Sequence, residues 1–132
     1  MRQEIKYRAW DNVAEKMYYC GEEDVICFEV ESGRIKATEA SEDNGYEELA
    51  HLKYMQYLGK DINENDLYDQ DICEDENGNR FLIMWSDYFL SWCYIEYLGD
   101  LREYPLHDFK GTYRKVGNKF DNPELLEIEV VE

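Results

Sequence analysis

The chain contains 132 residues, of which 31 are acidic and 14 are basic, and its net charge is −17. This length is enough for one ordinary domain, with or without a small appendage, and a hydrophobic fraction of 44% with 15% aromatic residues excludes a disordered or low-complexity chain. Because a strong negative charge repels phosphate backbones and anionic membrane surfaces, the composition disfavours direct binding to nucleic acids or membranes.

The first forty residues have the alternation expected of a small antiparallel β-meander. The predicted strands cover residues 3–10, 16–20, 25–31 and 34–38. Asp11 supplies turn chemistry after the first strand, and Gly33 allows a positive φ between the last two. These strands predict two successive hairpins.

Residues 39–53 mark a change in composition. Residues 39–45 are polar without periodicity and predict a surface loop, whereas residues 46–53 are compatible with a short helix that directs two leucines inward. We therefore expect an N-terminal β-meander subdomain over residues 1–52 and a second part over residues 53–132.

The second part has the pattern of a small closed or half-closed β-barrel. The predicted strands cover residues 53–58, 67–75, 80–85 and 91–98. Asn77 and Gly78 predict a two-residue hairpin turn of the mirror-image type, which needs a positive φ at both positions. Near the end of the chain, Asn122 as N-cap and Pro123 at the first helical position predict a short C-terminal helix. The expected fold class is therefore mainly β with minor α.

Three blocks of sequence, in chain order, are similar to motifs of one protein family. They are EIKYRAWDNVAEKMYY at 4–19, MQYLGKDINENDLYDQDIC at 55–73, and YPLHDF with VGNKFDNPELL at 104–109 and 116–126. On these blocks the chain resembles the YopX-like family of small proteins from phages and bacterial prophages. The resemblance implies an SH3-like β-barrel in the C-terminal part of the chain. It implies no activity, because such barrels carry many unrelated functions.

The chain departs from the family pattern in the loop between the first two barrel strands. The family tends to have glycine where this chain has Glu64 and Gln70, and the loop here is one residue shorter. Either the loop follows a different path, or these two residues adopt ordinary backbone conformations that need no glycine.

The same loop carries a partial calcium-binding pattern. Asp61, Asn63 and Asn65 stand at alternate positions, as the oxygen ligands of a helix–loop–helix calcium site do. The sixth position of that motif requires glycine and is Asp66, and the twelfth requires glutamate and is Ile72. We expect a solvated acidic loop and assign no metal ligand.

Enzymatic chemistry has little support in the sequence. The four cysteines have no two-residue spacing, which favours reduced core thiols over a disulfide or a zinc site. His107 and Asp108 provide a base and an orienting group for Cys73 or Cys93, but no local signature surrounds either thiol. We therefore expect no catalytic residues and no cofactor. Since no apolar leader or membrane-spanning run is present, we expect a cytoplasmic protein of a bacterial host.

Two surface features favour binding to another protein. The first is a set of aromatic residues that either fill the core or line a groove: Trp10, Tyr18, Tyr19, Trp85, Tyr88, Trp92, Tyr94 and Tyr97. The second is charge: residues 39–76 hold 13 acids against 2 bases, whereas residues 110–119 hold four bases and no acid. The basic run is either an exposed strand face or a contact for the acidic segment of a second copy, which would give a homo-oligomer.

These observations predict a non-enzymatic accessory protein that binds a protein partner of the host or the phage. The residues expected to contact that partner are Asp61, Glu64, Asp66, Asp69, Tyr88, Arg114 and Lys115. One alternative is an acidic nucleic-acid mimic that blocks a basic groove of a host protein, and another is a small hydrolase-like enzyme.

Overall fold

The structure is a computed structural model that describes residues 6–20, 22, 26–31, 34–41, 45–96 and 101–126. The chain divides into two compact units, Met1–Gln56 and Tyr57–Glu132, which we call unit 1 and unit 2. In the described residues the strands pair in antiparallel fashion and the only helices are two short 3-10 turns. The mainly β fold class is therefore confirmed.

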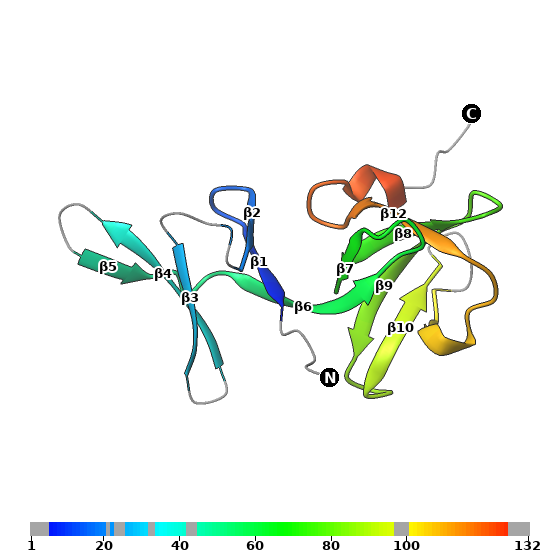
Figure 1. The fold of residues 1–132 in the computed structure, drawn as a ribbon, viewed down its shortest axis with the longest axis horizontal. Helices are drawn as coiled ribbons and strands as arrows, with labels where there is room; N and C mark the ends of the chain where they lie inside the picture. The colour runs from blue at the N-terminus through cyan, green and yellow to red at the C-terminus, as the bar shows by residue number, and fades with distance from the viewer. Residues whose placement is uncertain are drawn as a thin grey trace. The chain divides into compact units, whose positions relative to one another are not determined.

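Unit 1 contains two small sheets (Figure 1). Its strands are β1 (Tyr7–Asp11), β2 (Lys16–Tyr19), β3 (Ile26–Glu31), β4 (Arg34–Ser41), β5 (Gly45–Glu48) and the first half of β6 (Lys53–Lys60). β1 lies between β2 and β6 in one sheet, and β4 lies between β3 and β5 in the other. The apolar core that they share consists of Ala9, Tyr18, Ile26, Ala37 and Leu52.

The helix expected over residues 46–53 is wrong, because β5 occupies the first part of this segment. β5 pairs with β4 from Gly45 to Glu48, and the N–H of Leu49 donates a hydrogen bond to the carbonyl of Ala37 at 2.8 Å. A helix of eight residues is only marginally stable on its own, so the cross-strand hydrogen bonds decide the conformation.

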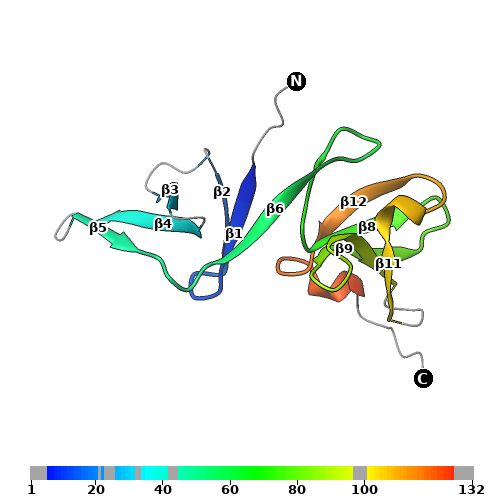
Figure 2. The same ribbon diagram turned by 90° about the horizontal axis from the view of Figure 1, so that it is seen from below.

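Unit 2 consists of a five-stranded sheet and a short pair of strands that precede it (Figure 2). Its elements are the second half of β6, β7 (Asp66–Tyr68), β8 (Asp71–Asp75), β9 (Arg80–Ser86), β10 (Ser91–Ile95), β11 (Glu103–Pro105), η1 (Leu106–Asp108), β12 (Tyr113–Asn118) and η2 (Pro123–Leu126). The sheet order is β11-β10-β9-β8-β12, and the strands curve into a half-barrel around a core centred on Leu67, Cys73, Phe81 and Ile83.

The single strand expected over residues 67–75 is broken at Gln70. β7 before the break pairs with β6, whereas β8 after it pairs with β9 and β12. Gln70 has a φ of 75°, its N–H donates to the carbonyl of Ile83, and its own carbonyl accepts the N–H of Lys119. The chain therefore passes from one sheet to the other at one left-handed residue whose backbone is fixed on both sides.

Two hairpin turns of unit 2 have the same sequence pattern and the same hydrogen bonds. They are Asp61–Asn65 (DINEN) and Asp75–Asn79 (DENGN). In each, the first residue's N–H donates to the fifth residue's carbonyl at 2.9 Å. The aspartate carboxylate then accepts the N–H groups of the third and fifth residues and the side-chain amide of the fifth. We call these the paired aspartate turns.

The second of these turns corrects the two-residue turn expected at Asn77 and Gly78. The loop has three residues, and only Gly78 has a positive φ, of 84°. The Asp75 carboxylate holds the N–H of Asn77, which favours an ordinary first turn followed by one left-handed residue. In the first turn Glu64 occupies the equivalent position with a φ of 66°. Of the two alternatives for this loop, ordinary backbone conformations at Glu64 and Gln70 are therefore excluded, because both residues have a positive φ.

Replacing Glu64 with glycine is expected to raise the free energy of unfolding of unit 2 by about 1 kcal/mol, because a left-handed conformation strains any residue that has a Cβ. The matched control is Gly78→Ala in the other paired aspartate turn. A Cβ there meets no atom within 4 Å, so its expected loss of about 1 kcal/mol comes from the backbone alone. Urea unfolding measures the change in the free energy of unfolding for each variant. A change of the same sign in both variants would contradict the equivalence of the turns.

Candidate functional site

Among the described residues of unit 2, the end of the β9–β10 hairpin carries the most exposed large apolar side chains. The pair Ser86 and Ser91 closes a four-residue loop in which Leu90 has a φ of 53°. Ser86 Oγ accepts the N–H of Phe89 at 3.2 Å and donates to the Glu103 carboxylate at 2.6 Å. These bonds fix the loop to β11, so its conformation is held by the sheet behind it.

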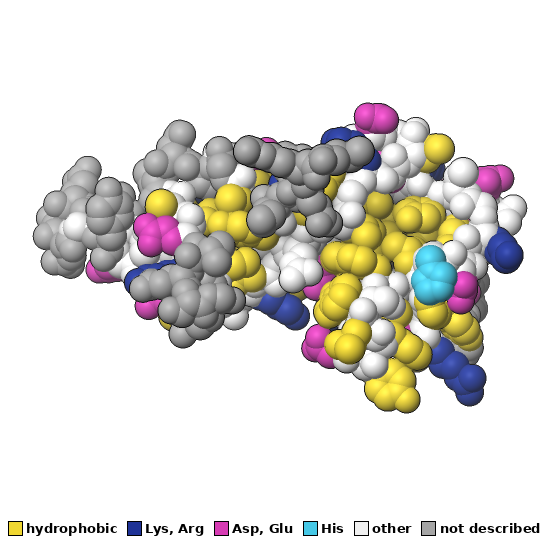
Figure 3. Space-filling view, turned by 60° about the horizontal axis from the view of Figure 1, so that its bottom comes forward, with side chains coloured by type: hydrophobic (Ala, Val, Ile, Leu, Met, Phe, Trp, Pro, Cys, Tyr) yellow, Lys and Arg dark blue, Asp and Glu magenta, His cyan; other side chains and the backbone are white. Residues whose placement is uncertain are grey.

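The three residues Tyr88, Phe89 and Leu90, which we call the hairpin tip, direct large side chains into solvent. Their exposed fractions are 85%, 46% and 73%. The rings of Tyr88 and Phe89 pack edge to face with centroids 4.9 Å apart. Figure 3 shows hydrophobic side chains gathered on the face of unit 2 that carries this end of the hairpin. A contiguous apolar surface of this kind is typical of an interaction site.

A pair of tryptophans occupies the strand positions next to the pair Ser86 and Ser91 that closes the loop. Trp85 on β9 and Trp92 on β10 are cross-strand partners whose rings pack edge to face at 5.8 Å. Trp92 and Tyr94 also pack against the core of unit 2. Trp92 therefore joins this end of the hairpin to the buried core.

Asp61 is largely buried, although the sequence placed it in a binding loop. It is only 9% exposed, and its carboxylate accepts the N–H groups of Asn63, Asn65 and Lys115 and the side-chain amide of Asn65. Burial alone raises the pKa of Asp61, but these donors outweigh it and lower the pKa. Because four donors already occupy its oxygens, Asp61 forms a turn and fastens β12 rather than presenting a metal ligand.

The other predicted acids differ in their surroundings. Asp66 Oδ1 accepts hydrogen bonds from Lys60 Nζ at 2.8 Å and the Tyr57 hydroxyl at 3.2 Å. Asp69 accepts the backbone N–H of Trp85 at 3.1 Å. Glu64 is the member of the predicted set whose side chain is exposed on the loop. Most of these carboxylates therefore have a structural role within unit 2.

The predicted basic residues Arg114 and Lys115 differ because side chains alternate along β12. Arg114 is 57% exposed and its guanidinium donates to Glu74 at 3.1 Å. Lys115 is 22% exposed, with its Nζ 3.3 Å from the fully buried Asp71 carboxylate and 5.9 Å from the centre of the Tyr68 ring. The structure therefore brings Lys115 into the interior, beside Asp71, and leaves Arg114 at the surface.

The sequence model of the YopX protein family matches residues 6–127. The chain belongs to the YopX family. Its fold is similar to the crystal structure of the protein yopX from Bacillus subtilis, with a TM-score of 0.62 and 18% sequence identity over 92% of this chain and 98% of that one. No curated protein matches the chain. At this identity the likeness establishes the fold that the family members share.

The thiol and histidine pattern of this YopX-family chain does not form a catalytic arrangement. Cys73 and Cys93 have no exposed surface, and burial raises the pKa of the Cys73 thiol. His107 lies 3.3 Å from Asp108, and both side chains are exposed. Among the described residues, no group of three or more His, Cys, Asp or Glu side chains is placed to hold a metal ion.

One cluster of unit 1 had no counterpart in the sequence analysis. The buried Asp11 carboxylate accepts hydrogen bonds from the Tyr18 hydroxyl at 2.9 Å and the N–H groups of Val13 and Ala14, and it lies 2.8 Å from His51 Nε2. Burial opposes the charge, but these partners together lower the pKa of Asp11 to about 2. The turn chemistry of Asp11 was visible in the sequence, whereas its contact with His51 depends on the fold.

The aromatic set is divided between the units. Trp10, Tyr18 and Tyr19 lie in unit 1, whereas Trp85, Tyr88, Trp92 and Tyr94 lie in unit 2, and Tyr97 lies outside the described residues. Tyr18 belongs to the core of unit 1, and Trp92 and Tyr94 pack on the core of unit 2. In the described part of the chain, no helix combines the length and the apolar character that crossing a membrane requires.

Proposed function

We propose that the protein is a non-enzymatic module that binds another protein by inserting its hairpin tip into an apolar pocket of that partner. The observation that carries this proposal is the exposure of three consecutive large apolar side chains, Tyr88, Phe89 and Leu90, on a loop that is fixed by hydrogen bonds. Aromatic residues in a fixed conformation bind with a small loss of conformational entropy.

The backbone at Leu90 supports the same proposal. A leucine at a φ of 53° is strained by about 1 kcal/mol or more relative to glycine, and its side chain is mostly exposed, so the folded state alone gains little from it. Strained residues of this kind concentrate at binding sites. In this proposal the strain is offset when the partner covers the side chain.

The negative charge of the chain indicates the charge of the partner's binding surface. The net charge of the chain is −17, and the exposed Asp87 directly precedes the hairpin tip. An apolar pocket with lysines or arginines around its rim complements this combination, and long-range attraction increases the association rate.

Family membership supports a proposal for the kind of protein and its location. The chain belongs to the YopX family, and we propose that it acts as a phage or prophage accessory protein in the cytoplasm of a bacterial host, with a host or phage protein as its partner. The half-barrel supports an SH3-like barrel in the C-terminal part as the scaffold that carries the hairpin tip.

The alternatives need features that have less support. A nucleic-acid mimic requires a row of carboxylates directed into solvent, whereas Asp61, Asp69 and Asp75 accept backbone N–H groups within unit 2. A small hydrolase requires an accessible nucleophile or a paired acid and base in a cleft, and the candidate thiols Cys73 and Cys93 are buried.

The test is affinity capture from host lysate followed by a binary binding measurement with the captured protein. Replacing Tyr88 and Phe89 with serine and Leu90 with glycine is expected to weaken binding by more than about thirtyfold, because hot-spot side chains are removed. Glycine at position 90 also relieves strain, so circular dichroism should show a fold at least as stable as the wild type.

The matched control is Glu64→Gln, which removes an exposed acid outside the hairpin tip. Full binding by the tip variant would overturn the proposal. Loss of binding in the control, together with a steep fall of affinity above physiological salt, would favour the nucleic-acid mimic instead.

A further inference from the structure

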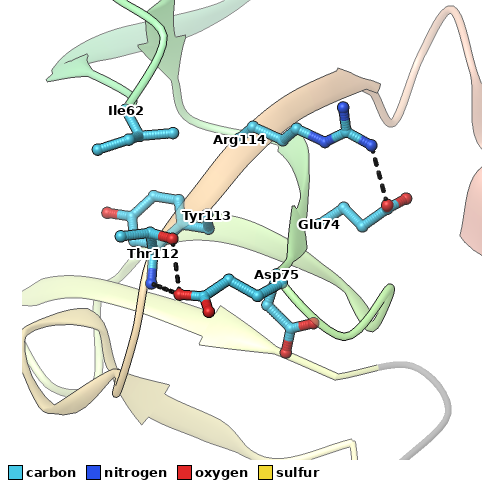
Figure 4. A pocket seen from close by; sticks show the side chains of 7 residues that line it. Ile62, Glu74, Asp75, Thr112, Tyr113 and Arg114 are labelled. Carbon is cyan, nitrogen blue, oxygen red and sulfur yellow. Dashed lines mark hydrogen bonds and ion pairs between the residues drawn. The ribbon is translucent and has the colours of Figure 1, made fainter.

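The paired aspartate turns and the start of β12 line an open pocket of about 240 Å³ (Figure 4). The residues that line it are Ile62, Glu74, Asp75, Glu76, Thr112, Tyr113 and Arg114. The turn at residues 75–79 and the hairpin tip lie at opposite ends of β9, so the pocket is a surface separate from the one proposed above.

One wall of this pocket is apolar and firmly held. The Tyr113 ring packs edge to face against Phe81 at 5.6 Å and against Phe109 at 5.2 Å, which fixes it to the core. Ile62, from the first of the paired aspartate turns, is 63% exposed and extends over the same hollow (Figure 4). The two side chains give a ligand a hydrocarbon surface beside polar groups.

The polar side of the pocket is acidic. Three consecutive acidic residues, Glu74, Asp75 and Glu76, and one basic residue, Arg114, line it. Glu74 is paired with Arg114 at 3.1 Å and with Arg80 at 3.3 Å, and the Asp75 carboxylate holds its own turn, which leaves Glu76 as the carboxylate without a cationic partner in the lining. Glu76 Oε1 accepts the N–H of Thr112 at 3.3 Å and its hydroxyl at 2.8 Å. A carboxylate accepts up to about four hydrogen bonds, so Glu76 keeps acceptor capacity for a ligand.

We propose that this pocket binds the lysine or arginine side chain of a partner protein, with the cationic head at Glu76 and the methylene groups against Ile62 and Tyr113. The volume is smaller than the roughly 300–1,000 Å³ of small-molecule sites, and it suits one long side chain. An aromatic ring and carboxylates together recognise cations, and the stem of a basic side chain packs on apolar surface.

The test is an NMR titration of the full chain with N-acetyl-lysine methylamide as the probe. We expect saturable shifts confined to the pocket residues, and at least tenfold weaker binding of N-acetyl-norleucine methylamide, which has the stem but no charge. The same probe should bind Glu76→Gln at least about fivefold more weakly, because one carboxylate is lost while the amide oxygen can still accept from Thr112.

Two controls separate a site from general attraction to an acidic protein. Glu64→Gln removes an equally accessible acid outside the pocket lining and should leave probe affinity unchanged. The hairpin tip variant should also bind the probe normally, so failure of this inference and failure of the proposed function are distinguishable. Shifts spread over all acidic residues without saturation, or tighter binding of N-acetyl-glutamate methylamide, would overturn the assignment.

Discussion

Replacing Lys115 with alanine is expected to lower the free energy of unfolding of unit 2 by about 3 kcal/mol, because a fully buried carboxylate loses a nearby ammonium group. Lys115 Nζ lies 3.3 Å from Asp71 Oδ2, and Asp71 has no exposed surface. The same ammonium donates to the carbonyl of Asp66 at 3.2 Å, so the substitution also removes a hydrogen bond.

The neighbouring Arg114→Ala is the matched control, with an expected loss below about 1 kcal/mol. The Arg114 side chain is 57% exposed, so solvent screens its ion pair, and Glu74 keeps Arg80 as a second cationic partner at 3.3 Å. Lys115→Met keeps most of the hydrocarbon stem and separates the loss of charge from the loss of packing. Urea unfolding followed by two-dimensional NMR reports unit 2 separately, and similar losses for Arg114→Ala and Lys115→Ala would contradict the inward position of Lys115.

Asp61→Ala is expected to lower the free energy of unfolding of unit 2 by about 3 kcal/mol, whereas Asp75→Ala lowers it by about 1 kcal/mol. Both aspartates hold the same turn, so the loss of turn hydrogen bonds is common to both. Asp61 is also buried and accepts the N–H of Lys115 on β12 at 2.8 Å. In the described structure, Asp75 has no equivalent contact with another strand.

The difference between these two variants measures the connection between the first turn and β12. Hydrogen exchange at the Lys115 amide provides a second measurement, since it should become faster in Asp61→Ala and stay slow in Asp75→Ala. Equal losses of stability would show that the contact with β12 contributes nothing. Neutralising Asp61 would also confound a binding measurement because it destabilises unit 2, whereas Glu64→Gln removes only an exposed charge.

Much of the fold could be predicted because local sequence signals and long-range pairing agree. A short helix beginning at Pro123 was expected, and the structure has a 3-10 turn there, but the Asn122 side chain accepts the N–H of Asn118 on β12 instead of an N–H of the turn. A hairpin across Asn77 and Gly78 was expected, and the structure contains it between β8 and β9. The exact turn type was missed, since it depends on the Asp75 carboxylate two residues earlier. The pattern of aspartate first and asparagine third and fifth was present in both turns and would have predicted their equivalence.

Other features could not be predicted from one sequence. The break at Gln70 follows from hydrogen bonds to Ile83 and Lys119, which are distant in the chain. The different surroundings of Arg114 and Lys115 depend on which face of β12 meets Asp71. Of the residues expected to bind a partner, Tyr88 lies in the exposed apolar hairpin tip. The sequence did not predict this cluster, because the conformation of the loop between β9 and β10 was not predicted.

The hydrogen bond from Lys115 to Asp61 also bears on the solubility of the protein. β12 is the last strand of its sheet, and a strand at a sheet edge offers N–H groups on which a second chain can add. The Asp61 carboxylate occupies one of these groups and places a negative charge at the edge. A strand that adds to this edge must displace an ionised side chain from a fixed turn. The contact therefore disfavours aggregation by strand addition at β12.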